Sequence, residues 1–365
     1  AVSWLARSGG GPRNVIANTS SGGVTLTGRG GSLAGSATTD TVGSGLELGA
    51  TAVLSKSGTI TLNGDSSASN TGLAYGFTSN HTAGNANFVG PSHYGAQPST
   101  TINSVDMSSS TANIVFNVDS FLIANTSSTS TSINTAGTVT IDPAVGGSPI
   151  QSFDRAVSVT GLTISNITGF EVGQVGTPSA GAMNSANVSI DQALSVAGPI
   201  NVYGGDVTLA ANVTSTALDS RVSIRSTGSI TQNASTTLRT NSGRVVLWGD
   251  QDSTSGGMVI LRGNVCTAPT ATTCDVNAAT GGDDIIIGGA AADSVDASIP
   301  AGFATGTGTA TQNVTTGVQL GTMGTANTGA KLYSSGGNIT INGQSVVTAA
   351  NVTANSFGIM LVSGT

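Results

Sequence analysis

Gly204-Gly205-Asp206-Val207-Thr208-Leu209 is the stretch that decides the fold, because a turn-like Gly-Gly-Asp leads directly into three alternating residues. Side chains alternate between the two faces of a β-strand, so Val207 and Leu209 share one face while Thr208 lies on the other. Glycine and short polar residues before such a run are typical of a tight turn. The stretch therefore predicts a short strand with one buried face.

The same pattern recurs along the chain. Short alternating runs occur at Val24-Thr25-Leu26, Ile60-Thr61-Leu62, Val139-Thr140-Ile141, Val188-Ser189-Ile190, Val222-Ser223-Ile224, Val245-Val246-Leu247, Ile285-Ile286-Ile287 and Ile339-Thr340-Ile341. Several steps between such runs are 21 to 23 residues, as from Val222 to Val245, and others are near 15. Steps near 20 match one turn of a parallel β-solenoid, in which each strand pairs with strands of the neighbouring turns. A two-sheet sandwich would need more hairpin signals than the two Asn-Gly pairs at Asn63 and Asn342.

Composition supports an all-β fold. The chain of 365 residues holds 52 glycines but only 11 Lys and Arg, too few strong helix formers for long helices. A hydrophobic share of 38% opposes disorder. We therefore expect residues 1–365 to form one continuous β-solenoid segment. The inward side chains are predicted to include Val207, Val222, Val245, Ile285 and Ile339.

Charge and chain ends narrow the class of protein further. A net charge of −7 offers no basic stripe for phosphates, which argues against nucleic acid as a partner. No run of about 18 apolar residues is present, so we expect no membrane-spanning helix. The chain begins at Ala1 without Met and closes on an uncharged strand-like run, 358–365. We expect it to be a segment of a longer chain or a subunit of a polymer.

An aromatic-bearing stretch at 73–97 departs from the alternation and is predicted to be a loop outside the coil. Such loops are frequent binding positions, although covering the side of the solenoid is an equally good explanation. The candidate binding residues there are Tyr75, Phe77, His81, Phe88, His93 and Tyr94.

Cys266 and Cys274 lie eight residues apart in a Thr-, Pro- and Ala-rich loop, 265–275. Two cysteines that close one short loop favour a disulfide formed in an oxidising compartment, and the alternative is a pair of free thiols. A zinc site would need further ligands, and both histidines lie far away in the sequence.

Two sets of aspartates are candidate sites. Asp250 and Asp252, with Asp283 and Asp284, would form a candidate catalytic cluster near Arg244 or Arg262 if their turns stacked, although corner residues explain them more simply. The segment 281–289 also resembles, once, the glycine-rich nonapeptide that binds calcium in tandem copies. Asp283 and Asp284 are therefore the candidate calcium ligands, with a solvated turn as the alternative. No other cofactor is expected.

The segment from about Pro199 to Val347 resembles the large exoproteins of the filamentous haemagglutinin type, which are passengers of two-partner secretion or autotransport. The residues that carry the resemblance are 204–209, 224–233, 243–250 and 336–344, with their recurrent Gly-Gly-Asn/Asp-Val/Ile-Thr-Ile/Leu pattern. The resemblance implies a right-handed parallel β-helix that reaches the bacterial cell surface through an outer-membrane transporter.

Together these observations favour a non-enzymatic, secreted surface adhesin or extracellular filament subunit. Its expected partners are a host or neighbouring-cell surface or glycan, and further copies of itself stacked head to tail. The alternative is a carbohydrate-active β-helix enzyme, a polysaccharide lyase or hydrolase, which would need a matched set of carboxylates.

Overall fold

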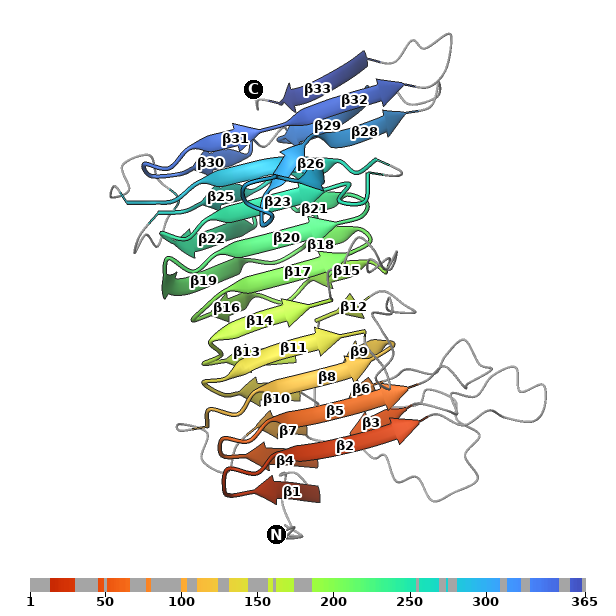
Figure 1. Ribbon diagram of the computed structural model, residues 1–365, viewed down its shortest axis with the longest axis vertical. Helices are drawn as coiled ribbons and strands as arrows, with labels where there is room; N and C mark the ends of the chain where they lie inside the picture. The colour runs from red at the N-terminus through yellow and green to blue at the C-terminus, as the bar shows by residue number, and fades with distance from the viewer. Residues whose placement is uncertain are drawn as a thin grey trace, which may run out of the picture. The chain divides into compact units, whose positions relative to one another are not determined.

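The computed structural model contains many short β-strands in which buried and exposed side chains alternate as expected (Figure 1). The structure describes residues 14–29, 45–48, 51–65, 77–79, 100–103, 110–123, 131–143, 157–159, 162–173, 186–253, 256–268, 274, 281–308, 314–322, 329–347 and 355–362. The regular structure in these ranges consists of β-strands. The chain divides into two units, Ala1–Ala182 and Met183–Thr365.

Apart from β12, the described strands of the first unit fall into three sets of paired strands. One has the order β1-β4-β7-β10-β13, the second runs β2-β5-β8-β11-β14 and the third is β3-β6-β9. The strands are β1 (Asn14–Asn18), β2 (Val24–Arg29), β3 (Leu46–Leu48), β4 (Thr51–Ser55), β5 (Ile60–Asp65), β6 (Phe77–Ser79), β7 (Thr100–Asn103), β8 (Ile114–Val118), β9 (Phe121–Ile123), β10 (Thr131–Asn134), β11 (Thr138–Asp142), β12 (Val157–Ser158), β13 (Leu162–Ser165) and β14 (Gly169–Val172).

The second unit repeats the arrangement with β17-β20-β23-β26, β15-β18-β21-β24-β29-β33 and β16-β19-β22-β25-β30, while β31 pairs with β26 and β28 with β32. The strands are β15 (Val188–Ile190), β16 (Leu194–Val196), β17 (Ile200–Gly204), β18 (Val207–Leu209), β19 (Val213–Leu218), β20 (Val222–Ser226), β21 (Ile230–Gln232), β22 (Thr237–Asn241), β23 (Val245–Gly249), β24 (Val259–Leu261), β25 (Asn264–Cys266), β26 (Ile285–Ala292), β27 (Pro300–Gly302), β28 (Ala304–Gly308), β29 (Val314–Leu320), β30 (Lys331–Tyr333), β31 (Ile339–Ile341), β32 (Gly343–Val347) and β33 (Asn355–Leu361).

Strands within each of these sheets pair in parallel, with the β26–β27 hairpin as an antiparallel exception. Each strand pairs with one that lies several elements away in sequence, as β20 does with β23. The prediction of an all-β fold with parallel stacking is therefore confirmed. The β-solenoid and its right-handedness stay predictions.

The core consists of columns of inward side chains that are in register from strand to strand. In the second unit one column is Ile200, Val222, Val245, Ile285 and Ile339. The first four are fully buried, and so is Val207 in a neighbouring sheet. Ile339, however, is 43% exposed. It occupies the inward register, but no described strand pairs with its free edge to cover it.

Polar side chains next to the strands bind backbone N–H groups beside the neighbouring strands. The carboxylate of Asp206 accepts a hydrogen bond from the Ser229 N–H at 2.8 Å, and Asn187 accepts one from the Asp206 N–H at 2.8 Å. Asn212 accepts one from the Thr237 N–H at 2.8 Å. Each bond links the segments that lead into two neighbouring strands. It also gives a backbone N–H group in a turn the hydrogen-bond partner that it requires. This explains why Asn, Asp and Ser recur before the apolar runs.

The predicted loop at 73–97 is a strand in part. Residues Phe77–Ser79 form β6, which pairs in parallel with β3 and β9. The loop prediction is therefore wrong for these three residues, because their backbones continue a sheet. Tyr75, His81, Phe88, His93 and Tyr94 lie outside the described residues.

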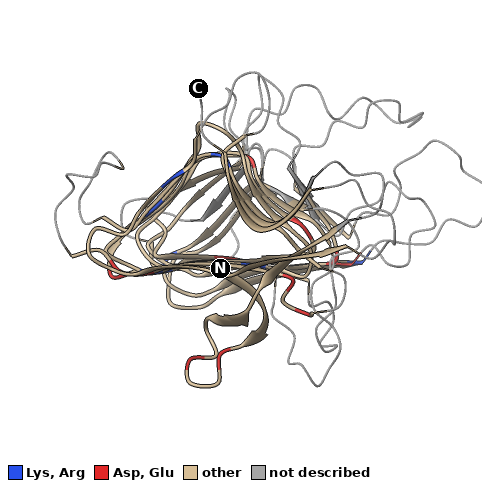
Figure 2. Cartoon of the chain, turned by 90° about the horizontal axis from the view of Figure 1, so that it is seen from above, with Lys and Arg blue, Asp and Glu red and all other residues tan. Residues whose placement is uncertain are grey.

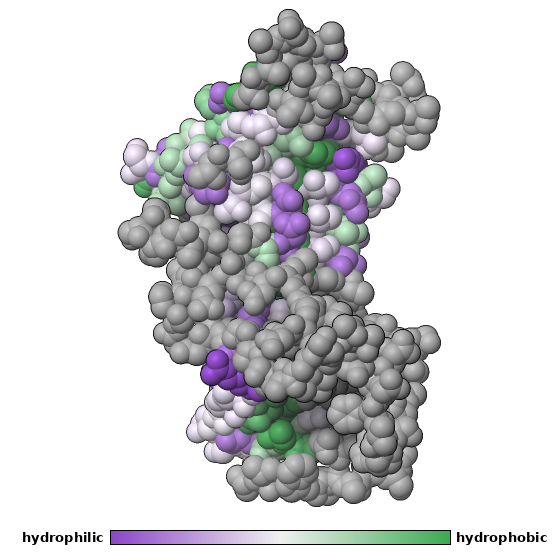
Figure 3. Space-filling model, turned by 90° about the vertical axis from the view of Figure 1, so that its right-hand side faces the viewer, coloured by the Kyte–Doolittle hydropathy of each residue, from purple (hydrophilic) through white to green (hydrophobic). Residues whose placement is uncertain are grey.

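One face of the described part is weakly polar over much of its area. Pale atoms, the colour of glycine, serine and threonine on the hydropathy scale, cover much of the described part of one face (Figure 3). Among the described residues there is no helix long and apolar enough to cross a bilayer.

Candidate functional site

The four aspartates considered as a catalytic cluster lie at opposite ends of two neighbouring strands. Asp250 directly follows β23, whereas Asp284 directly precedes β26, and the two strands pair in register from Val245↔Ile285 to Gly249↔Gly289. Five residues at about 3.3 Å each place roughly 16 Å between the two ends. The predicted grouping of Asp250 and Asp252 with Asp283 and Asp284 is therefore wrong.

The carboxylates of Asp283 and Asp284 each accept a hydrogen bond from a backbone N–H. The Asp284 carboxylate accepts a hydrogen bond from the Asn338 N–H at 2.7 Å, and the Asp283 carboxylate accepts one from the Asp284 N–H at 2.7 Å. This repeats the corner arrangement of Asp206. Within the described ranges, no three His, Cys, Asp or Glu side chains gather closely enough to hold a metal ion. The calcium assignment stays a prediction.

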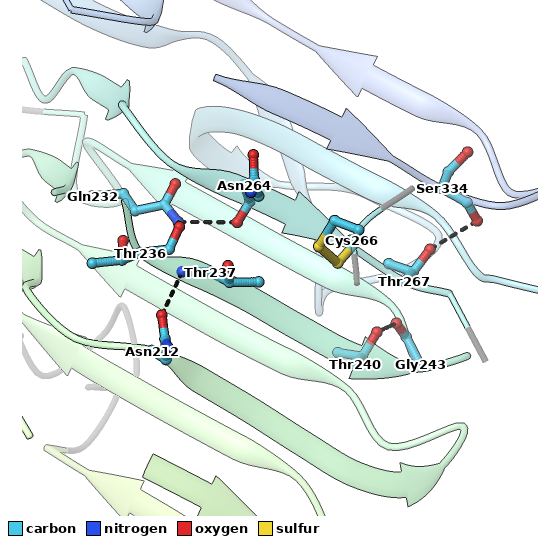
Figure 4. Close-up of a disulfide and its surroundings, with 11 residues drawn as sticks. Asn212, Gln232, Thr236, Thr237, Thr240, Gly243, Asn264, Cys266, Thr267 and Ser334 are labelled. Carbon is cyan, nitrogen blue, oxygen red and sulfur yellow. Dashed lines mark hydrogen bonds between the residues drawn. A yellow bond between two sulfur atoms is a disulfide. The ribbon is translucent and has the colours of Figure 1, made fainter. Parts of the chain in front are cut away.

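Cys266 and Cys274 are joined by a disulfide, which closes a loop between β25 and β26 (Figure 4). Cys266 is buried, and the neighbouring Thr267 hydroxyl donates hydrogen bonds to the carbonyl oxygens of Asp283 at 2.6 Å and Ser334 at 2.8 Å. The disulfide and these two hydrogen bonds hold the segment between β25 and β26 in place. We assign the disulfide a structural role.

A cation–aromatic stack on the outer face of the β17-β20-β23 sheet is the most distinctive side-chain cluster among the described residues. Tyr203, Arg225 and Trp248 occupy the same register on successive strands. The Arg225 guanidinium lies 5.6 Å from the Tyr203 ring centre and 4.8 Å from that of Trp248. Both distances suit an attraction between a cation and an aromatic face. Burial lowers the pKa of Arg225, while Tyr203 opposes that shift.

The β26–β27 hairpin projects from this face and carries acidic residues in its turn (Figure 2). The Trp248 indole N–H donates to the carbonyl oxygen of Ala290 at 2.8 Å, and Trp248 is 2% exposed. Nη2 of Arg225 donates to the Ser298 carbonyl oxygen at 3.3 Å. The hairpin thus covers the aromatic end of the stack and uses Arg225 as an anchor.

An ion pair makes a third link between the hairpin and the sheet. Nη1 of Arg244 donates to the Asp296 carboxylate at 2.8 Å. The hydroxyl of Ser298 donates to the other carboxylate oxygen at 2.5 Å, and the Ser298 N–H donates to the same oxygen at 2.9 Å. Hydrogen bonds from Ser298 and from Arg244 lower the pKa of Asp296 to about 2. Asp296 is therefore ionised across the ordinary pH range.

Sequence reasoning missed this cluster, although a signal was present. Tyr203, Arg225 and Trp248 each stand three residues after the first inward residue of their strands, Ile200, Val222 and Val245. Aligning the apolar runs would have put the three side chains in one outward column. The hairpin has no such signal, because its residues 290–299 interrupt the repeat.

No family model, curated protein or solved structure matches this chain. The geometry of its own residues therefore carries the functional argument.

Proposed function

We propose that this chain is a non-enzymatic, secreted bacterial surface adhesin or extracellular filament subunit of the filamentous haemagglutinin type, built as a right-handed parallel β-helix. The observation that carries the proposal is the set of inward columns, such as Ile200, Val222, Val245 and Ile285, stacked strand on strand in parallel. A repeated coil of this kind presents an extended outer surface for contact with a cell or glycan.

Self-association is part of the proposal. Two further columns of the second unit end in β33 with Ile359 and Leu361, which are 42% and 72% exposed. Both continue the register of buried or half-buried residues of β29, Val318 and Leu320. The exposed apolar edge of one copy can stack against the strands of a second copy. Head-to-tail contacts of this kind do not form a closed ring, so they produce an open filament.

Secretion through an outer-membrane transporter to the cell surface completes the proposal. It rests on the sequence resemblance, and the Cys266–Cys274 disulfide supports it, since disulfides persist in oxidising compartments.

The test separates an adhesin from a carbohydrate-active enzyme. The purified full chain is incubated with bacterial and host cells and with a panel of polysaccharides, and both retention and release of reducing or unsaturated ends are measured. We expect retention on at least one surface without product release. Turnover that Asp250→Asn or Asp284→Asn abolishes would contradict the proposal and favour the enzyme.

A further inference from the structure

Two buried polar atoms lie without a partner on or beside the outer face that carries the hairpin. Oδ1 of Asn201 and Nε of Arg244 have no hydrogen-bond partner among the described residues. Asn201 is in register with Ser223, which is only 1% exposed, and Arg244 directly precedes β23 of the same sheet. Leaving such groups unpaired in a buried position is unfavourable. These two atoms of the face therefore stay unpaired while the hairpin is in place.

The hairpin presents oxygen atoms to both arginines of this face. Arg244 binds the Asp296 carboxylate through one nitrogen, and Arg225 binds the Ser298 carbonyl oxygen through one nitrogen. A guanidinium is a planar fork that suits two-point binding of a carboxylate. Each arginine thus holds its hairpin partner by one bond, with donors left over.

The hairpin itself is weakly built. β27 pairs with β26 at Gly289↔Gly302 and Ala292↔Pro300, with an irregularity between them. A two-stranded hairpin is only marginally stable by itself, so its position depends on its contacts with the sheet. The links through Trp248, Arg225 and Arg244 are polar bonds that a ligand with matching groups can replace.

We propose that the outer face beneath the hairpin is a binding strip for a carboxylate-bearing polysaccharide, and that the Asp296–Ser298 turn occupies the strip until such a ligand displaces it. In the bound state a uronate carboxylate takes the place of Asp296 on Arg244, and an oxygen of the ligand takes the place of the Ser298 carbonyl oxygen on Arg225. A sugar hydroxyl donates to Oδ1 of Asn201, and the apolar face of the ring packs on Trp248 and Tyr203. This inference rests on the proposed adhesin function and names its ligand class.

The test uses the fluorescence of Trp248. The full chain has two tryptophans, so Trp4→Phe leaves Trp248 as the only reporter. Oligogalacturonate is titrated into this protein, with a neutral oligogalactan as the ligand control. We expect a saturable change in Trp248 emission with oligogalacturonate only, because the indole loses its hydrogen bond to Ala290 when the hairpin moves.

Variants decide the mechanism. Arg244→Gln should weaken binding about 10-fold or more, because it removes a charge-assisted hydrogen bond. Asp296→Asn should tighten binding about fivefold, because it removes the internal competitor. The matched controls are Asp293→Asn, in the same turn, and Arg29→Gln, whose ion pair with Asp65 is in the first unit; both should leave the affinity unchanged.

Three results would overturn the inference. They are an unchanged Trp248 emission, equal binding by the Arg244 variant, and no gain with Asp296→Asn, which alters an exposed turn and leaves the core intact. Equally tight binding of dextran sulfate would overturn the choice of a carboxylate. Cleavage of the oligogalacturonate would contradict the proposed adhesin function while leaving the binding strip in place.

Discussion

Ile339 stacks directly on Ile285 in one inward column, yet Ile285 is fully buried and Ile339 is 43% exposed. The two residues have the same chemistry and the same register, so the difference arises from the next strand, which covers Ile285 and has no counterpart over Ile339 within the described residues. Burial in this fold is therefore a property of stacking.

The column makes a direct prediction about charge. Val245→Asp should lower the free energy of unfolding by about 3 kcal/mol or more, because the buried carboxylate has no partner there. Ile339→Asp, at the exposed position of the same column, should cost about 1 kcal/mol or less. Chemical denaturation of both variants measures the difference. Equal costs would show that Val245 does not face the core.

The close approach of two backbone segments at Gly243 leads to a second prediction. A Cβ at Gly243 would overlap the backbone carbonyl of Ser220, whereas a Cβ at Gly329 would meet nothing within 4 Å. Gly243→Ala should cost about 1–3 kcal/mol, because backbone must shift, and Gly329→Ala should stay within about 0.5 kcal/mol of the wild type. Thermal unfolding of the two variants tests this. A neutral Gly243→Ala would argue against the close approach of Gly243 to the backbone of Ser220.

The disulfide should stabilise the chain through its unfolded state. Closing the short loop from Cys266 to Cys274 removes chain entropy worth about 2.5 kcal/mol. Reductant should therefore lower the denaturant midpoint of the wild type. The double variant Cys266→Ala, Cys274→Ser should already have the lower midpoint and show no response to reductant, since the chain has no other cysteine. If reductant also lowered the midpoint of the double variant, the effect would not come from the disulfide.

The hairpin contact should depend on pH in a defined direction. The pKa of Asp296 falls from 3.8 to about 2 on folding, so its ionised form stabilises the folded state. That contribution is complete above the unfolded pKa and is lost as the pH falls through the folded pKa. The stability difference from Asp296→Asn should thus be constant near neutrality and disappear towards pH 2. A carboxyl carbon titration by NMR with a midpoint at 3.8 would contradict the hydrogen bonds from Ser298 and Arg244.

The apolar runs made most of the fold predictable. Val207, Val222, Val245 and Ile285 are buried as expected, because period-two alternation determines which face of a strand is apolar. The exposure of Ile339 was not predictable, because the local pattern does not say which strands are covered by a further strand. The predicted aspartate cluster was wrong for a related reason. Asp250 follows its strand and Asp284 precedes the paired strand, so parallel pairing separates them by the length of a strand. The hairpin pairing of Arg244 with Asp296 joins residues 52 apart and has no local signal.

We propose that the stack of parallel strands continues from one copy of the chain to the next. Native mass spectrometry with sedimentation across a range of concentrations tests it most directly. We predict species at whole-number multiples of 35.5 kDa that grow with concentration, and open filaments of the same material in electron micrographs. Ile359→Glu with Leu361→Glu, at exposed positions of β33, should return the chain to a monomer without unfolding it. A wild-type chain that stays at 35.5 kDa at every concentration, indistinguishable from the variant, would contradict the claim.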